Sequence, residues 1–268
     1  MQHGKYKKFI ASIFSITTFF VLFFALPATA TTLHVDNSFY GVNNVDVTFN
    51  GNDITTSAAE LRVYFDGNSG SFLPAFCVDL SDPLSVGVDN HVKSLQSPES
   101  YNPANGLYTE WLMDSFSVQL GYKNSSIGLV SSYQGAGLQL AIWETFYDLY
   151  APTPPGASTP YNLDYDDTFT SYAGTGIFSY DRNPVIGGVN DEVNKWYDFF
   201  IQELVDEIDA GSLFTSTGKY IVAELTYNNI DKQDLMTVNP VPEPSTIMLF
   251  GLGLLGIGAI GRKKTQLK

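Results

Sequence analysis

Cysteine and histidine are scarce in this 268-residue chain. It has one cysteine, Cys77, and three histidines, His3, His34 and His91. A single cysteine cannot form an internal disulfide, so Cys77 is a buried free thiol, an intermolecular link or a reactive group. Two histidines beyond the first residues are too few for a His-rich metal centre or a His-based catalytic triad. We expect His34 and His91 at the surface or in loops.

Basic residues are also scarce between residues 31 and 240. This stretch has seven Lys and Arg against 27 Asp and Glu, a net charge of −20. Such a body repels nucleic acid and anionic lipid surfaces, so no nucleic-acid partner is expected. The acidic residues are too widespread to identify a glycosidase dyad, and the acidic run at 164–167 lacks the turn glycine of a calcium loop. We expect no metal and no cofactor.

The sequence also lacks a P-loop and the G-x-S-x-G motif that carries the serine nucleophile of many hydrolases. A hydrolase is therefore the weakest of the functions considered, and the chain is not expected to be an enzyme. Aromatic residues are abundant, at 14% of the sequence. This composition is typical of a folded domain rather than of a disordered segment.

The N-terminus has the features of a secretory signal peptide over residues 1–30. A lysine cluster at residues 5–8 precedes an apolar run, Phe9 to Leu26, and Ala28-Thr29-Ala30 forms a small-residue cleavage site. The alternative is an uncleaved membrane anchor, although the run is at the short limit for a membrane span. Either segment predicts export of the residues that follow.

The C-terminus, residues 239–264, has three parts. A proline linker contains Pro242, Glu243 and Pro244, a glycine-rich apolar run follows, and a basic cluster ends it at Arg262, Lys263 and Lys264. The apolar run is short for a transmembrane helix, and the basic cluster favours the cytoplasmic side. In this order the three parts resemble the PEP-CTERM sorting signal. An ordinary C-terminal anchor is the alternative.

The PEP-CTERM resemblance implies recognition and processing by a membrane-embedded exosortase in a Gram-negative type bacterium. The tail would hold the protein in the membrane before processing. The product would then reach the cell surface or the extracellular matrix.

Residues 31–238 are expected to form one α+β domain, a mainly antiparallel β sandwich or barrel with a segregated helical part. Two short strands are predicted in 32–50, with turns at Asn43-Asn44 and Asn50-Gly51. Further strands are expected at 61–65, 72–80, 220–227 and 234–238, and helices at 107–116, 132–150 and 191–210. Asn190 is the predicted N-cap of the last helix, and Gly211 its C-terminal stop.

Two residues within apolar segments carry the candidate chemistry. Gln139 shares a helix face with Ile142 and Trp143, which places its amide on the buried side, where an amide must be hydrogen-bonded. Cys77 lies inside an apolar strand. Held together in a dry core, the two side chains can form an internal thioester with loss of ammonia, an acyl group ready for attack by an amine. The plainer alternative is a buried thiol and a glutamine bonded to backbone.

The two surrounding segments resemble the motifs of bacterial thioester domains of surface adhesins. The matching residues are Phe76-Cys77-Val78-Asp79 and Gln139-Leu140-Ala141-Ile142-Trp143. The resemblance implies a Cys77–Gln139 bond, with Phe76, Asp79 and Trp143 as supporting motif residues. Leu138 departs from the family, in which a threonine commonly precedes the glutamine.

The expected function is therefore that of an exported, adhesion-type surface or matrix protein. It would attach covalently to an amine or hydroxyl on a protein or polysaccharide of a surface or biofilm matrix. The alternative is a structural or polysaccharide-binding matrix protein without covalent chemistry.

Overall fold

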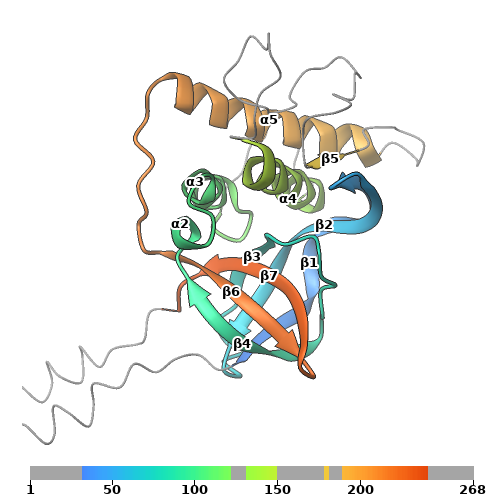
Figure 1. The fold of residues 1–268 in the computed structure, drawn as a ribbon. Coiled ribbons are helices and arrows are strands. Elements are labelled where there is room, and N and C mark those ends of the chain that lie inside the picture. Colours follow the sequence, from blue (N-terminus) through green and yellow to red (C-terminus); the bar gives the residue numbers. More distant parts are fainter. Residues whose placement is uncertain (1–31, 122–130, 150–177, 181–188, 241–268) are drawn as a thin grey trace, which may run out of the picture. The chain divides into compact units, whose positions relative to one another are not determined.

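Residues 30–239 form one compact unit. The structure, a computed structural model, describes residues 32–121, 131–149, 178–180 and 189–240 (Figure 1). The predicted signal peptide and nearly all of the predicted sorting tail lie outside these ranges. Within them, no helix has the length and apolar character needed to cross a membrane.

Six antiparallel strands close into a barrel. Going round it, β1 pairs with β2, then come β3, β7, β6 and β4, which pairs again with β1. The strands are β1 (Thr32–Phe49), β2 (Asn52–Phe65), β3 (Leu73–Cys77), β4 (Val88–Gln96), β6 (Tyr220–Tyr227) and β7 (Ile230–Val238). Closure leaves no open edge between these strands. The predicted α+β class is confirmed, with a barrel as its sheet.

The first strand is longer than the sequence suggests. Residues 32–49 form a single strand, β1, and the predicted turn at Asn43-Asn44 is wrong. The pairing with β2 shifts register between Val42 and Val45 instead, and Asn44 adopts a positive φ of 60°. Asparagine tolerates this conformation, so the irregularity is absorbed inside the strand. The turn at Asn50-Gly51 is present, with both residues at positive φ.

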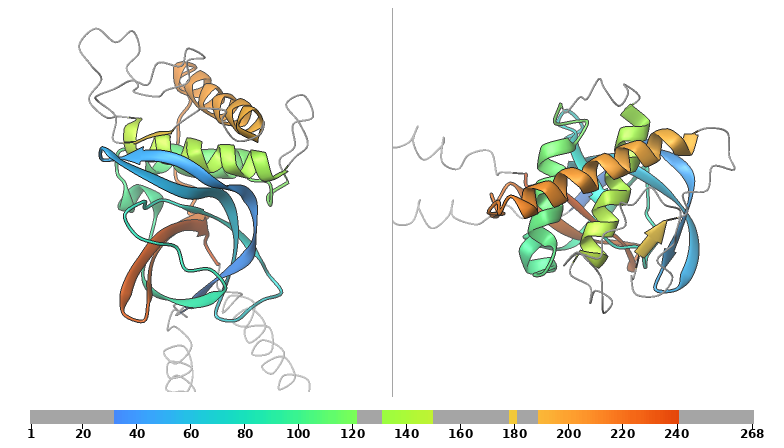
Figure 2. Two further views of the ribbon diagram at one scale, coloured as in Figure 1. Left: turned by 90° about the vertical axis from the view of Figure 1, so that its right-hand side faces the viewer. Right: turned by 90° about the horizontal axis from the view of Figure 1, so that it is seen from above.

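The far end of β1 extends past the barrel, where β5 (Phe178–Tyr180) pairs with it. The helices gather at one end of the barrel, as Figures 1 and 2 show. They are α2 (Pro98–Tyr101), α3 (Gly106–Phe116), α4 (Ser131–Asp148) and α5 (Val189–Asp209). Helix α4 packs on β1 and β2, and α5 packs on α4. This segregation of helices from the sheet agrees with the predicted arrangement.

Helix α5 buries the stripe that its sequence predicts, from Val193 through Trp196 to Leu204. It begins at Val189, so Asn190 lies within the helix and is not its N-cap. Gly211, just past its end, has φ +74° and provides the expected stop.

Glycines allow α4 to approach its neighbours closely. A Cβ on Gly135 would lie 2.0 Å from the carbonyl oxygen of Tyr40 on β1. A Cβ on Gly137 would lie 2.6 Å from the Cβ of Trp196 on α5. Both distances are far inside van der Waals contact, so only glycine fits at these two crossings. Helix α4 is thereby held between the barrel and α5.

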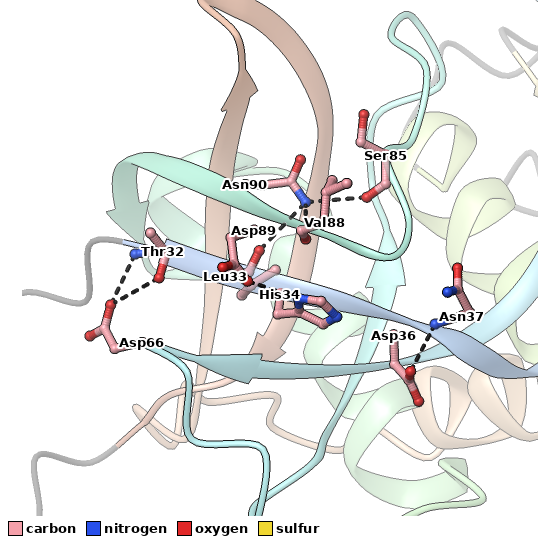
Figure 3. Close-up of polar contacts among 10 residues, drawn as sticks. All are labelled: Thr32, Leu33, His34, Asp36, Asn37, Asp66, Ser85, Val88, Asp89 and Asn90. Atoms are coloured by element: carbon pink, nitrogen blue, oxygen red, sulfur yellow. Dashed lines mark hydrogen bonds and ion pairs between the residues drawn. The ribbon is translucent and has the colours of Figure 1, made fainter.

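Polar contacts join β1, β2 and β4 on one side of the barrel (Figure 3). The Asp66 carboxylate accepts hydrogen bonds from the backbone and hydroxyl of Thr32, at 3.0 and 3.4 Å. His34 is half-buried on strand β1. Its Nδ1 lies 2.8 Å from Asp89 Oδ1, and its ring stacks on the ring of Tyr64. His91 is exposed, also on a strand. The expected surface position is confirmed for His91, whereas the half-buried His34 lies neither at the open surface nor in a loop.

Candidate functional site

Strand β3 positions Cys77 at its last residue, inside the barrel wall. Cys77 pairs with Leu235 of β7, and Phe76 pairs with Met236. Phe76 and Cys77 are both buried, because the apolar segment that contains them runs between two neighbouring strands. Beyond the strand, the backbone N–H of Val78 donates to the carbonyl of Asp234 at 2.9 Å. The chain around Cys77 is therefore fixed from the β7 side.

Helix α4 brings Gln139 to Cys77, 62 residues earlier in the sequence. The Gln139 side chain is fully buried, and its Oε1 accepts a hydrogen bond from the backbone N–H of Cys77 at 2.9 Å. Its Nε2 donates to the carbonyl oxygen of Cys77, also at 2.9 Å. One amide thus binds both backbone groups of a single residue, which brings the Gln139 side chain against the backbone of Cys77 in the core.

This double hydrogen bond has two consequences. The bond satisfies the buried amide of Gln139, as the plainer interpretation expects for a glutamine bonded to backbone. The backbone in question is that of Cys77 itself. The bond also fixes the amide orientation, because the Cys77 N–H needs an acceptor and the Cys77 carbonyl needs a donor. The Gln139 carbonyl oxygen therefore faces an N–H group, which polarises the amide carbon.

The electrostatics of the site keep the sulfur protonated. Burial raises the pKa of the Cys77 thiol well above its ordinary value, and the nearby charge of Asp79 raises it further. An ionised thiolate is costly in such a dry site. Any reaction of this sulfur must therefore move its proton in the same process.

Tyr147 is a site residue that the sequence analysis missed. Its hydroxyl donates to the carbonyl of Val78 at 2.9 Å and accepts from the N–H of Leu80 at 3.1 Å. It anchors the segment directly after Cys77 to the same helix that carries Gln139. The helical spacing contains the signal, because Tyr147 lies eight residues, or about two turns, after Gln139 on the same face.

A second tyrosine supports the β7 side of the site. Tyr101 on α2 donates its hydroxyl proton to Asp234 Oδ2 at 2.7 Å, and Asp234 Oδ1 accepts from the N–H of Leu225 at 3.2 Å. Burial raises the pKa of Asp234, and the charge of Asp79 contributes to the rise. The carbonyl of Asp234 accepts the hydrogen bond from the N–H of Val78, so this network also fixes the backbone next to Cys77.

The remaining predicted motif residues have different surroundings. Asp79 Oδ1 accepts from the N–H of Ser81 at 2.8 Å and shapes the turn after the strand. Trp143 is fully buried, with its ring centroid 5.9 Å from that of Phe178. Its indole Nε1 has no hydrogen-bond partner within the described ranges. The sorting residues Pro242, Glu243, Pro244, Arg262, Lys263 and Lys264 lie outside those ranges.

The described residues contain no group of three or more His, Cys, Asp or Glu side chains that could hold a metal ion. The acidic run at 164–167 lies outside the described ranges.

Comparison with known proteins identifies the C-terminal segment. Residues 240–264 match the PEP-CTERM protein-sorting motif, which confirms the resemblance drawn from the proline linker, apolar run and basic cluster. The motif marks an exported surface protein that is processed by an exosortase. No curated protein matches the chain.

Among solved structures, the chain is similar to the N-terminal thioester domain of the fibronectin-binding protein SfbI from Streptococcus pyogenes. The identity is 13% and the TM-score 0.39, with 76% of this chain and 99% of that chain covered. Since this likeness is so low, the chemistry of Cys77 and Gln139 rests on this chain's own residues.

Proposed function

We propose that this exported domain forms an internal thioester between Cys77 Sγ and Gln139 Cδ and uses it once, to attach covalently to a partner. The observation that carries the proposal is the double hydrogen bond between the Gln139 amide and the Cys77 backbone. It holds the Gln139 amide, in a buried position, against the backbone of the residue that carries the thiol. Proximity of this kind converts a slow bimolecular reaction into an intramolecular one.

Thioester formation is a balanced acyl transfer. The Cys77 sulfur attacks Cδ of Gln139, the C–N bond to Nε2 breaks, and the thiol proton leaves with that nitrogen as ammonia. Negative charge develops on Oε1 during the attack. The Cys77 N–H, 2.9 Å from that oxygen in the starting state, is placed to stabilise it as an oxyanion-hole donor does.

Attachment reverses the roles of the groups. An amine on the partner attacks the thioester carbonyl, a C–N amide bond forms, and the C–S bond breaks. The amine proton passes to sulfur and restores the Cys77 thiol. The thiol is a good leaving group compared with an alkoxide, so the acyl group is activated without an external cofactor. Each molecule reacts once, and we propose no enzymatic turnover.

Burial protects the thioester before the partner arrives. Cys77 is 4% exposed and Gln139 is fully buried, so bulk water is excluded from the carbonyl. The hydroxyl of Tyr147 fixes the backbone that follows Cys77 through its hydrogen bonds to the carbonyl of Val78 and the N–H of Leu80. The rigid surroundings support a strained, reactive bond in a fixed orientation.

The partner is proposed to be a surface or matrix polymer that presents an amine or a hydroxyl. Residues 1–30 would direct export as a cleaved signal peptide. The tail would keep the protein in the membrane until exosortase processing. A polysaccharide-binding matrix protein without covalent chemistry is the alternative, and incorporation of methylamine separates the two.

The test is incorporation of methylamine into the purified exported protein. The thioester predicts one stable methylamide at Gln139 per molecule and the appearance of one free thiol. The variants Cys77→Ala and Gln139→Ala should incorporate none. Gln134→Ala is the matched control, because Gln134 is also buried on α4 but donates to the carbonyl of Phe116. Wild-type protein that incorporates no methylamine would leave only the non-covalent function.

A further inference from the structure

A pocket of about 170 Å³ lies between helix α3 and the segment that joins α5 to β6. It does not include Cys77, Gln139 or any residue of the thioester motifs. Its walls combine aliphatic, aromatic and acidic side chains: Leu107, Glu110, Trp111, Asp114, Leu213 and Phe214.

The carboxylate of Glu110 is the unusual group in this pocket. Glu110 is only 3% exposed, and its Oε1 accepts hydrogen bonds from the N–H and hydroxyl of Thr217, at 2.9 and 2.8 Å. Its Oε2 is buried and has no hydrogen-bond partner within the described part of the chain. A buried carboxylate oxygen without a donor is costly, so it signals a missing partner.

The second carboxylate of the pocket is already neutralised. Asp114 accepts from the ammonium of Lys219 and from the hydroxyl of Tyr220. Among the described residues, Glu110 forms no ion pair. The carboxyl group of the pocket that lacks a charged partner is therefore that of Glu110.

The walls favour an aliphatic chain with a cationic end. Trp111 and Phe214 meet edge to face with centroids 5.8 Å apart, and Phe214 also contacts Tyr108 at 4.6 Å. Leu213 is 92% exposed, which leaves an apolar surface beside the pocket. Aromatic rings attract ammonium groups, and apolar walls suit the methylene stem of a lysine. The strongly acidic body attracts such a cation from a distance.

We propose that this pocket binds a lysine side chain of a partner protein, with the ammonium group facing the Glu110 carboxyl group and the methylene stem lying along Leu213 and Phe214. The inference is independent of the thioester, because the two sites share no residue. It adds a reversible recognition site to the domain.

The experiment measures binding of Nα-acetyl-lysine-N-methylamide to the full exported chain carrying Cys77→Ala, so that no covalent capture can be mistaken for binding. Calorimetry should show saturable binding that weakens as salt is added. The Nε-acetylated compound, which lacks the charge, should bind at least about tenfold more weakly.

Three variants make the test specific to the pocket. Glu110→Gln should weaken binding about tenfold or more. Leu213→Ala should weaken it a few-fold without affecting the fold, because the side chain is almost fully exposed. Glu99→Gln, an exposed acidic residue on α2, is the matched control and should bind like the parent.

Absence of saturable binding, equal binding of the Nε-acetylated compound, or equal weakening by Glu99→Gln would each overturn the proposal. Preferential binding of methyl α-glucoside would overturn it too, and would show a glycan site instead. Because Cys77 is absent from the protein used, none of these outcomes bears on the proposed thioester.

Discussion

At the scale of single residues, the site depends on side chains that bind backbone. Gln139 binds both backbone groups of Cys77, and Tyr147 binds the carbonyl of Val78 and the N–H of Leu80. The two residues of the proposed thioester are thus held by the conformation of the backbone next to them. This makes Tyr147 a positioning residue rather than a reacting one.

Tyr147→Phe removes one hydroxyl and leaves two backbone groups without their partner. We expect a loss of about 1–3 kcal/mol in the free energy of unfolding, measured by urea denaturation. We also expect a smaller fraction of molecules that incorporate methylamine, which a purely structural role would not change. Tyr133→Phe, on the same helix and half-buried, should match wild type in both measurements. Unchanged incorporation in Tyr147→Phe would contradict the positioning role.

Glu60 makes the stability of the domain depend on pH. It is fully buried on β2, and its carboxylate accepts hydrogen bonds from Ser117, Val118 and Gln119. Burial raises its pKa above 4.5 even though these hydrogen bonds act in the opposite direction. The unfolded chain therefore loses this proton at a lower pH than the folded chain does.

The free energy of unfolding should consequently fall as pH rises from 4.5 through the raised folded-state pKa of Glu60. Glu60→Gln should remove the contribution of Glu60 to this fall in the free energy of unfolding. The contribution of Asp234 should remain, because burial raises the pKa of Asp234 as well. Urea denaturation at a series of pH values measures both, with the exposed Glu99→Gln as control. An unchanged pH slope in Glu60→Gln would contradict the assignment.

At the scale of elements, close approach of α4 to its neighbours positions Gln139. Gly137→Ala should destabilise the domain by about 1–3 kcal/mol, because the new Cβ would meet the Cβ of Trp196 at 2.6 Å and the backbone nitrogen of Tyr197 at 2.9 Å. The gain in helix propensity, about 1 kcal/mol, is smaller. Thermal unfolding measures the change. Glu203→Ala on the exposed face of α5 should have little effect, and stabilisation by Gly137→Ala would contradict the close packing.

Elements with a strong periodic signal could be predicted from the sequence, and those set by distant pairing could not. The apolar stripe of α5 and the position of Gln139 on a buried helix face follow from helical spacing. The length of β1 does not, because Asn44 looks like a turn residue and is accommodated as an irregularity within a paired strand. Closure of the barrel could not be predicted from the sequence either, since β3 pairs with β7 and β4 pairs with β1 across long sequence distances.

The same difference applies to the candidate sites. Cys77 and Gln139 could be matched to each other because each is an unusual occupant of an apolar segment. Glu110 gives no such signal, because in sequence it is one of many acidic residues of this chain. Only the fold brings Thr217 and Phe214 against it, more than a hundred residues later.

At the scale of the whole molecule, the sorting motif at residues 240–264 determines where the domain acts. Glu243→Ala should block processing, so that the unprocessed chain accumulates in the membrane fraction of the producing cell. Gln266→Ala, beyond the matched residues, should be processed like wild type. Immunoblots of membrane and released fractions measure the difference, and normal release of Glu243→Ala would contradict recognition of this motif.

The proposed covalent attachment depends on one bond, the Cys77–Gln139 thioester, which peptide mass spectrometry observes directly. The wild-type protein is purified without added amines and digested under mildly acidic conditions, so that a thioester survives. The account predicts one linked species that contains the peptides of Cys77 and Gln139 and is lighter than their sum by one ammonia. Two separate peptides at full mass, with a free thiol on Cys77 and an intact amide on Gln139, would contradict it.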